Sequence, residues 1–230
     1  MSTLRVMSYN VLHFENVVSG RIDYDAFAAL IRKSGADIVG LNEVYDRGAD
    51  FVSQTEELAK RLGWNGWFSK AFMDDEVNPF GNAVVSRFPI EQPQTFPVPY
   101  PDERPGTEYY EPRAVLRARI AGYTVLVTHF GLNPDEQQYA LQTVLPLIEN
   151  ERCILMGDFN VTPDNAVLRP IRARLCDADA ALPAGAMSFP SDAPRKKIDY
   201  IFTSADCTVQ RAEILPIVLS DHRPYLVTLG

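Results

Sequence analysis

The residues of this sequence that could do chemistry stand where short apolar runs begin or end. Asn10 follows one run, Glu43 follows a second, and Asp158 follows a third in the segment GDFNVTP. Asp221 and His222 precede the last run, in the segment LSDHRPYLV. A strand holds its terminal side chains rigidly while leaving them open to solvent, so we expect these residues to converge on one site.

The oxygen donors in this set favour a hard divalent cation. Mg²⁺ and Mn²⁺ take carboxylate and amide oxygens as ligands and keep waters that a substrate can displace. Such oxygens are offered by Asn10, Glu43, Asp158, Asn160 and Asp221. The chain has only three histidines and three cysteines, with no CxxC pair, which disfavours zinc.

Asp158 and Asn160 alternate with Phe159, which places both polar side chains on one face of an extended segment. One carboxylate that takes a proton from water would then lie beside one amide that donates to a phosphate oxygen. A helix cap or an Asx turn after a strand is the alternative interpretation of either residue alone.

Asp199 lies inside an apolar strand, where an unpaired carboxylate is costly, and it therefore needs a partner. His222 is the natural one, since a carboxylate on one imidazole nitrogen fixes the tautomer and raises the basicity of the other. Backbone donors could satisfy Asp199 instead. His129 ends the run VLVT and Arg113 opens the preceding strand, adding an imidazole and a fork-shaped phosphate donor, although each could be an ordinary surface residue.

The elements that must position these residues alternate between strands and helices. Runs rich in β-branched residues predict strands over 4–9, 38–41, 83–85, 114–120, 124–128, 153–156, 198–203 and 225–229. Apolar residues at helical spacing predict helices over 24–33, 55–62 and 135–149. Some neighbouring strands are joined by tight turns and others by helices, which predicts mixed sheets. The proline-rich stretch 91–112 is expected to form a loop.

Length and charge limit the class of protein. A chain of 230 residues suits a single domain spanning 1–230, and nothing in it resembles a signal peptide or a membrane span. The formal net charge of −8 argues against a non-specific nuclease, because nucleic-acid binding depends on Lys and Arg. Three widely spaced cysteines indicate reduced thiols and a cytoplasmic location.

Eight short motifs, taken in order, resemble the endonuclease/exonuclease/phosphatase superfamily of metal-dependent hydrolases, which includes deoxyribonuclease I, exonuclease III-type repair enzymes, neutral sphingomyelinases and inositol polyphosphate 5-phosphatases. They are SYNVL, GLNEV, GNAVVSRFPI, EPRAVLRA, VTHFGLN, GDFNVTPDN, KKIDYIF and SDHRP, and they extend from about residue 5 to 229. The resemblance implies an α/β fold, a four-layered sandwich of two packed mixed sheets flanked by helices, with the site at one end.

The resemblance also assigns a role to each matching residue. Glu43 would be the principal Mg²⁺ ligand, with Asn10 beside it and Asp221 contributing directly or through water. Asp158 would activate water and Asn160 would hold the phosphoryl oxygen. His129 and Arg113 would contact the phosphate. His222, paired with Asp199, would donate a hydrogen bond to the phosphate, and Asn133 would assist substrate binding.

Two departures from the family pattern bear on the substrate. Leu12 stands where the repair endonucleases carry an acid, and Arg195-Lys196-Lys197 is the only basic cluster. Both disfavour abasic-site DNA repair. We therefore expect a phosphodiesterase or phosphatase that acts on a small-molecule or lipid-headgroup phosphate, with two alternatives: a nuclease acting on DNA or RNA, and an inactive phosphate-binding module.

Overall fold

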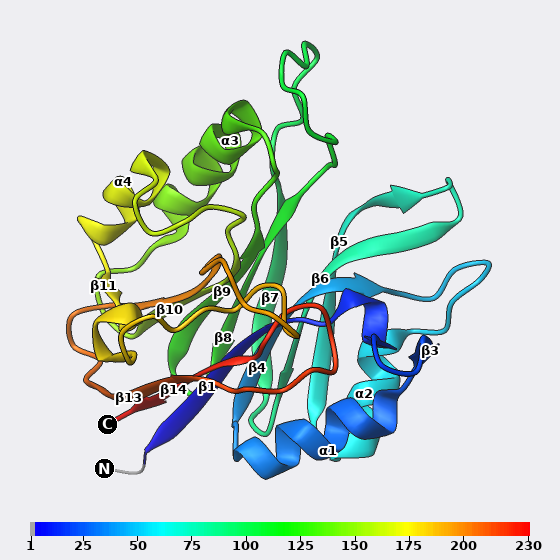
Figure 1. Ribbon diagram of the computed structural model, residues 1–230, viewed down its shortest axis with the longest axis horizontal. Coiled ribbons are helices and arrows are strands. Elements are labelled where there is room, and N and C mark those ends of the chain that lie inside the picture. The colour runs from blue at the N-terminus through cyan, green and yellow to red at the C-terminus, as the bar shows by residue number, and fades with distance from the viewer. Residues whose placement is uncertain (1–2) are drawn as a thin grey trace.

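The computed structural model describes residues 3–230 and contains two six-stranded sheets packed face to face (Figure 1). The first sheet has the order β13 (Val209–Ile214), β14 (Tyr225–Leu229), β1 (Leu4–Asn10), β4 (Ile38–Tyr45), β6 (Asn78–Ser86) and β5 (Asn65–Asp74). The second has the order β11 (Cys176–Asp177), β12 (Asp199–Thr203), β10 (Cys153–Asp158), β9 (Tyr123–His129), β8 (Ala114–Ile120) and β7 (Ile90–Pro97). Strands β2 (Glu15–Asn16) and β3 (Arg21–Ile22) form a separate small ribbon.

Helices cover the outer face of each sheet (Figure 1). Helices α1 (Tyr24–Ser34) and α2 (Gln54–Leu62) pack on the first sheet, and α3 (Pro134–Val144) and α4 (Arg169–Arg172) pack on the second. A separate apolar cluster that includes Val84, Val127 and Met156 fills the space between the sheets. The result is the expected four-layered α/β sandwich.

The sequence explains where the helices begin and end. Asp23 caps α1 by accepting a hydrogen bond from the Ala26 amide, and Gly35 ends it at a φ of 70°. The third predicted helix is shorter than expected, because Pro146 lacks the N–H that would continue it, and the chain turns into the 3₁₀ segment η2 (Leu145–Leu147). Further 3₁₀ segments are η1 (Leu12–Phe14), η3 (Ala166–Leu168) and η4 (Ala178–Ala181). Among residues 3–230, no helix has the length and hydropathy that a bilayer span requires.

All eight predicted strands are present, and the tight turn at Ala121 and Gly122 joins β8 to β9 as an antiparallel hairpin. The expectation of a loop over 91–112 is wrong for its first part, because β7 occupies Ile90–Pro97. This strand is an edge of its sheet, with a register shift between Glu91 and Gln94, and an edge position tolerates prolines that cannot donate to a neighbour. Only residues 98–113 form the loop.

The register of the central strands brings the polar strand ends to one edge of the sandwich. In the parallel pair β1 and β4, Asn10 lies opposite Asn42. In the parallel pair β9 and β10, His129 lies opposite Asp158, and Asp158 in turn lies opposite Asp199 on antiparallel β12. Both sheets therefore direct chemically active side chains to the same end of the molecule.

Gly157, next to Asp158, provides a test of this arrangement. Its φ is +148°, and an added Cβ would lie 1.8 Å from the Thr128 carbonyl oxygen on β9. Because that oxygen is backbone, we expect Gly157→Ala to lower the free energy of unfolding by about 2–5 kcal/mol. Gly185→Ala is the matched control, since Gly185 also has a positive φ of +77° but open space around it, and it should cost only about 1 kcal/mol. Equal losses for the two variants in urea denaturation would show that the close approach of β9 and β10 does not constrain the fold.

Candidate active site

A cavity of about 720 Å³ opens where the polar ends of the two sheets meet. Seven of the residues predicted from the sequence line it, and they come from both sheets: Glu43, Arg113, His129, Asp158, Asn160, Asp221 and His222. Asn10 and Asp199 are fully buried and in contact with this lining. The convergence expected from the strand ends is therefore present.

Two of the lining residues have left-handed backbone conformations. Glu43 has a φ of 58° and lies in a bulge of β4, where the register with β6 shifts between Leu41 and Val44. Asn160 has a φ of 52° and lies two residues after the end of β10. A non-glycine residue in this region costs roughly 1–2 kcal/mol, and such strain gathers at functional sites. In both places the strained residue lines the cavity.

Asn42 joins the two sheets beneath the cavity, a role that the sequence did not reveal. Its side-chain oxygen accepts from the Asp158 amide at 3.0 Å, and its Nδ2 donates to Asn82 Oδ1 at 2.8 Å and to the Thr128 carbonyl at 2.9 Å. The side chain is fully buried. An amide with all these partners satisfied fixes β4 against β9 and β10. The signal was present in the motif GLNEV, where this residue directly precedes Glu43.

The carboxylate of Asp158 is the centre of the site. Its Oδ1 accepts from the Asn160 amide at 2.9 Å, and its Oδ2 accepts from Asn10 Nδ2 at 3.2 Å. The Nε2 atoms of His222 and His129 each lie 3.5 Å from Oδ2. Burial raises the pKa of Asp158 to about 7, in opposition to the nearby His222, so the group can exchange a proton near neutral pH.

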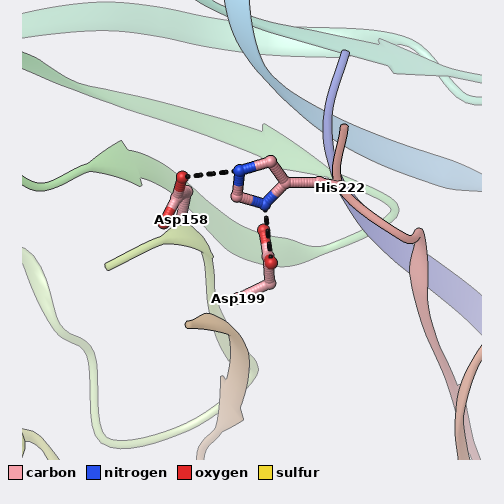
Figure 2. A group of neighbouring side chains, drawn as sticks. All are labelled: Asp158, Asp199 and His222. Atoms are coloured by element: carbon pink, nitrogen blue, oxygen red, sulfur yellow. Dashed lines mark hydrogen bonds and ion pairs between the residues drawn. The ribbon is translucent and has the colours of Figure 1, made fainter. Parts of the chain in front are cut away.

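Asp199 and His222 form the pair that the sequence predicted. Figure 2 shows the imidazole of His222 between two carboxylates, with its Nδ1 2.9 Å from Asp199 Oδ2 and its Nε2 directed at Asp158. Burial acts to lower the pKa of His222, but the charges of Asp199 and Asp158 outweigh it and raise this pKa to about 10. A protonated His222 therefore presents an Nε2–H donor at the cavity.

His129 is held from the other side of the site. Arg113 Nη1 lies 2.7 Å from His129 Nδ1, and Arg113 also pairs with Glu111 at 2.5 Å. Burial, together with the charge of Arg113, lowers the pKa of His129 well below its ordinary value. A neutral ring that accepts at Nδ1 from Arg113 carries its hydrogen on Nε2, the nitrogen that lies 3.2 Å from the side-chain amide of Asn160 and 3.5 Å from Asp158 Oδ2. Glu111, which the sequence analysis did not single out, completes this series of side-chain contacts, from Glu111 through Arg113 to His129.

Asn133 is not part of the cavity lining. Its side chain is buried and lies at the start of α3, where its Oδ1 accepts from the Glu108 amide and its Nδ2 donates to the Glu108 carbonyl, both at 3.1 Å. Nδ2 also donates to Glu136 at 2.8 Å. Asn133 thus anchors the 98–113 loop, and Glu108, Tyr109, Glu111 and Arg113 of that loop line the cavity.

The lining carries more acid than base. The acidic side chains are Glu43, Glu108, Glu111, Asp158 and Asp221, and the only Lys or Arg residues in it are Arg113 and Lys196. Such a lining favours a cation and disfavours a long polyanion.

Two sets of residues in the described chain could bind a cation. Asp158, Asp199 and His222 have ligand atoms within 4.8 Å of one another. However, His222 Nδ1 already pairs with Asp199 Oδ2 at 2.9 Å, so a cation there would break a buried pair. The other set is Glu43 and Asp221, which line the cavity, with Asn10 donating to Glu43 at 2.7 Å. The carboxylate oxygens of Glu43 and Asp221 suit Mg²⁺ or Mn²⁺, whereas the oxygen of Asn10 accepts from the Leu12 amide at 3.2 Å.

The fold and the site together define a class of hydrolase that acts on phosphate esters. A family model for the endonuclease/exonuclease/phosphatase family matches residues 7–222, and the chain belongs to this family. Its members are phosphoesterase hydrolases that depend on divalent metal ions, and this chain is an enzyme of the phosphoesterase class. The comparison with curated protein sequences yields no match.

Solved structures share the fold over the whole chain. An endonuclease/exonuclease/phosphatase from Beutenbergia cavernae superposes with a TM-score of 0.83 at 23% identity, over 100% of this chain and 72% of its own. A family protein from Leptotrichia buccalis gives 0.77 at 20% identity, covering 99% of both chains. The mannosyl-6-phosphatase Bt3783 of Bacteroides thetaiotaomicron gives 0.78 at 21% identity, also over 99% of both chains.

The anchoring of the 98–113 loop by Asn133 can be tested by amide hydrogen exchange. Asn133→Ala removes two hydrogen bonds to Glu108, each worth about 1 kcal/mol, and should speed exchange in residues 106–111 roughly tenfold or more. Asp23→Ala is the control, because it removes a helix cap without touching this loop. If exchange in residues 106–111 is the same in Asn133→Ala and wild type, Asn133 is not the anchor.

Proposed function

We propose that this protein is a Mg²⁺- or Mn²⁺-dependent hydrolase of phosphate esters, a phosphodiesterase or phosphatase acting on a small-molecule or lipid-headgroup substrate. The observation that carries the proposal is the placement of Asp158. Its buried carboxylate lies within 3.5 Å of two imidazoles in a cavity lined by further oxygen donors. We also propose that the protein works in the cytoplasm, which its three free cysteines support.

Glu43 would hold the metal ion, with Asp221, which also lines the cavity, and with Asn10 beside it. The strained backbone of Glu43 supports this role, because the conformation turns a carboxylate toward the cavity at a cost in stability. As placed, Asn10 donates to both Glu43 and Asp158, so it also fixes the spacing of the two carboxylates. A bound Mg²⁺ would act as a Lewis acid on a phosphate oxygen.

The other side chains around the cavity would each have a separate role in the reaction. Asp158 would orient the attacking water and take its proton, since its pKa is raised to about 7. His222, held by Asp199, would donate from Nε2 to a phosphoryl oxygen. Asn160, His129 and Arg113 would add donors where negative charge grows in the transition state. Each such donor is worth roughly 2–4 kcal/mol.

The lining of the cavity supports a small substrate. The 98–113 loop lines the cavity through Glu108, Tyr109, Glu111 and Arg113, and its two acidic side chains would repel a polynucleotide backbone. The fold is shared with a protein named a mannosyl-6-phosphatase, which fits a phosphorylated small molecule. The nuclease alternative lacks a basic channel among the lining residues, and the ordered hydrogen bonds of Asp158 and Asp199 disfavour an inactive module.

The test is hydrolysis of bis-p-nitrophenyl phosphate and p-nitrophenyl phosphate with Mg²⁺ or Mn²⁺, with plasmid DNA assayed alongside. We expect release from at least one small ester, no nicking of DNA, and loss of turnover on chelation with EDTA. Asp158→Ala should lower kcat by about 10³-fold and His222→Ala by about 10²–10³-fold, because each removes a group that acts in the transition state. Both variants should keep the wild-type circular dichroism spectrum, and His222→Ala should lower Tm because it leaves the buried Asp199 carboxylate without its partner.

Each other outcome contradicts a stated part of the proposal. DNA nicking that Asp158→Ala lacks would make the protein a nuclease. Full activity in either purified variant would reject the assignment of the site. Absence of turnover on every substrate tried with both metals would favour the phosphate-binding module.

A further inference from the structure

A lysine is buried directly behind the Asp199–His222 pair. Lys197 precedes β12 by two residues, and its side chain is only 4% exposed. Its ammonium group donates to the backbone carbonyl of Asp199 and lies 2.8 Å from Asp179 Oδ1. The reaction outlined above makes no use of this cation.

The partners of Lys197 connect the two sheets beneath the catalytic pair. Its Nζ lies over the rings of Tyr200 on β12, at 3.8 Å from the centroid, and Tyr225 on β14, at 4.8 Å. The Tyr225 hydroxyl donates to Asp179 Oδ1 at 3.0 Å. Asp199 begins β12 and His222 lies three residues before Tyr225, so these contacts fix the two strands that carry the catalytic pair.

Asp199 needs positive charge nearby. The residue is fully buried, and its Oδ1 has no hydrogen-bond partner within the described chain. A buried carboxylate with one unsatisfied oxygen is costly unless cations compensate for it. His222 supplies one cation, and Lys197 supplies a second that is fixed to the same residue through its backbone.

The charges that face Lys197 come from several elements. They are Asp179 of η4, Asp177 of β11 and Asp199 of β12. Burial lowers the pKa of Lys197, and these three carboxylates act in the opposite direction. Two tyrosine rings over the ammonium group add a favourable cation–π contact.

We propose that Lys197 is a positioning residue, which holds Asp199 at hydrogen-bonding distance from His222 and compensates its charge through the Lys197–Asp179–Tyr225 cluster. The catalytic consequence rests on the proposed function, whereas the effect on the Asp199–His222 hydrogen bond does not.

The test uses Lys197→Met, which keeps the length of the side chain and removes its charge. The first readout is the Nδ1 proton resonance of His222 in metal-free protein, assigned by its absence in His222→Ala, with Asp199→Asn as the reference for a broken pair. We expect this resonance to move upfield or broaden through exchange with water in Lys197→Met. The second readout is steady-state kinetics, in which kcat should fall roughly tenfold or more while KM stays unchanged.

A double variant separates positioning from stability. Lys197→Met alone leaves Asp179 without its cation and should lower Tm, whereas Lys197→Met with Asp179→Asn removes both charges and should recover Tm. We expect the double variant to keep the shifted resonance and the low kcat. Arg172→Met is the matched control, because Arg172 pairs with the neighbouring Asp177 at 2.9 Å and makes its other bond to the Pro163 carbonyl. It should leave both readouts as in wild type.

Two results would overturn the proposal. One is a wild-type resonance in Lys197→Met. The other is a double variant in which resonance and kcat recover together with Tm, since that would make the cluster a stabilising contact only. If wild-type protein hydrolyses none of the substrates, the resonance still decides the role of Lys197 while the proposed function fails separately.

Discussion

Burial of the Asp158 carboxylate where two sheets meet is the constraint on which the rest of the site depends. A charge in such a place is costly unless hydrogen-bond donors surround it, and three neighbouring residues provide donors here. Asn10 and the Asn160 amide bind its two oxygens, and His222 faces it with a charge that Asp199 maintains. The same burial that requires these partners raises the pKa of the carboxyl group, so the cost to stability is coupled to the role as a base that we propose for it.

This arrangement exists only when the two sheets are packed together. Asn10 and Glu43 come from the first sheet, and Asp158 and Asp199 from the second. Gly40 on β4 permits the close approach, because a Cβ at this position would lie 2.6 Å from the sulfur of Met156 on β10. Formation of the core and assembly of the site are therefore one event, with Asn42 as the polar link between them.

Much of this could be predicted from sequence, because strand ends are visible as the points where apolar runs stop. That signal located Asp158 and His222 and assigned Asp199 its partner. It did not find Asn42, whose role depends on a strand in the other sheet, or β7, whose prolines are tolerated only at an edge. Asn133 resembled a substrate ligand by motif, but its contacts with the 98–113 loop, distant in sequence, determine where it lies.

The most direct test of the central claim is a crystal structure of the protein with Mn²⁺ and inorganic phosphate, with the metal located by its anomalous scattering. The account predicts Mn²⁺ at Glu43, with Asp221 and Asn10 nearby, and phosphate facing His222, His129 and Asn160, while Asp199 and His222 stay paired. Metal bound between Asp158, Asp199 and His222, with that pair broken, would contradict it.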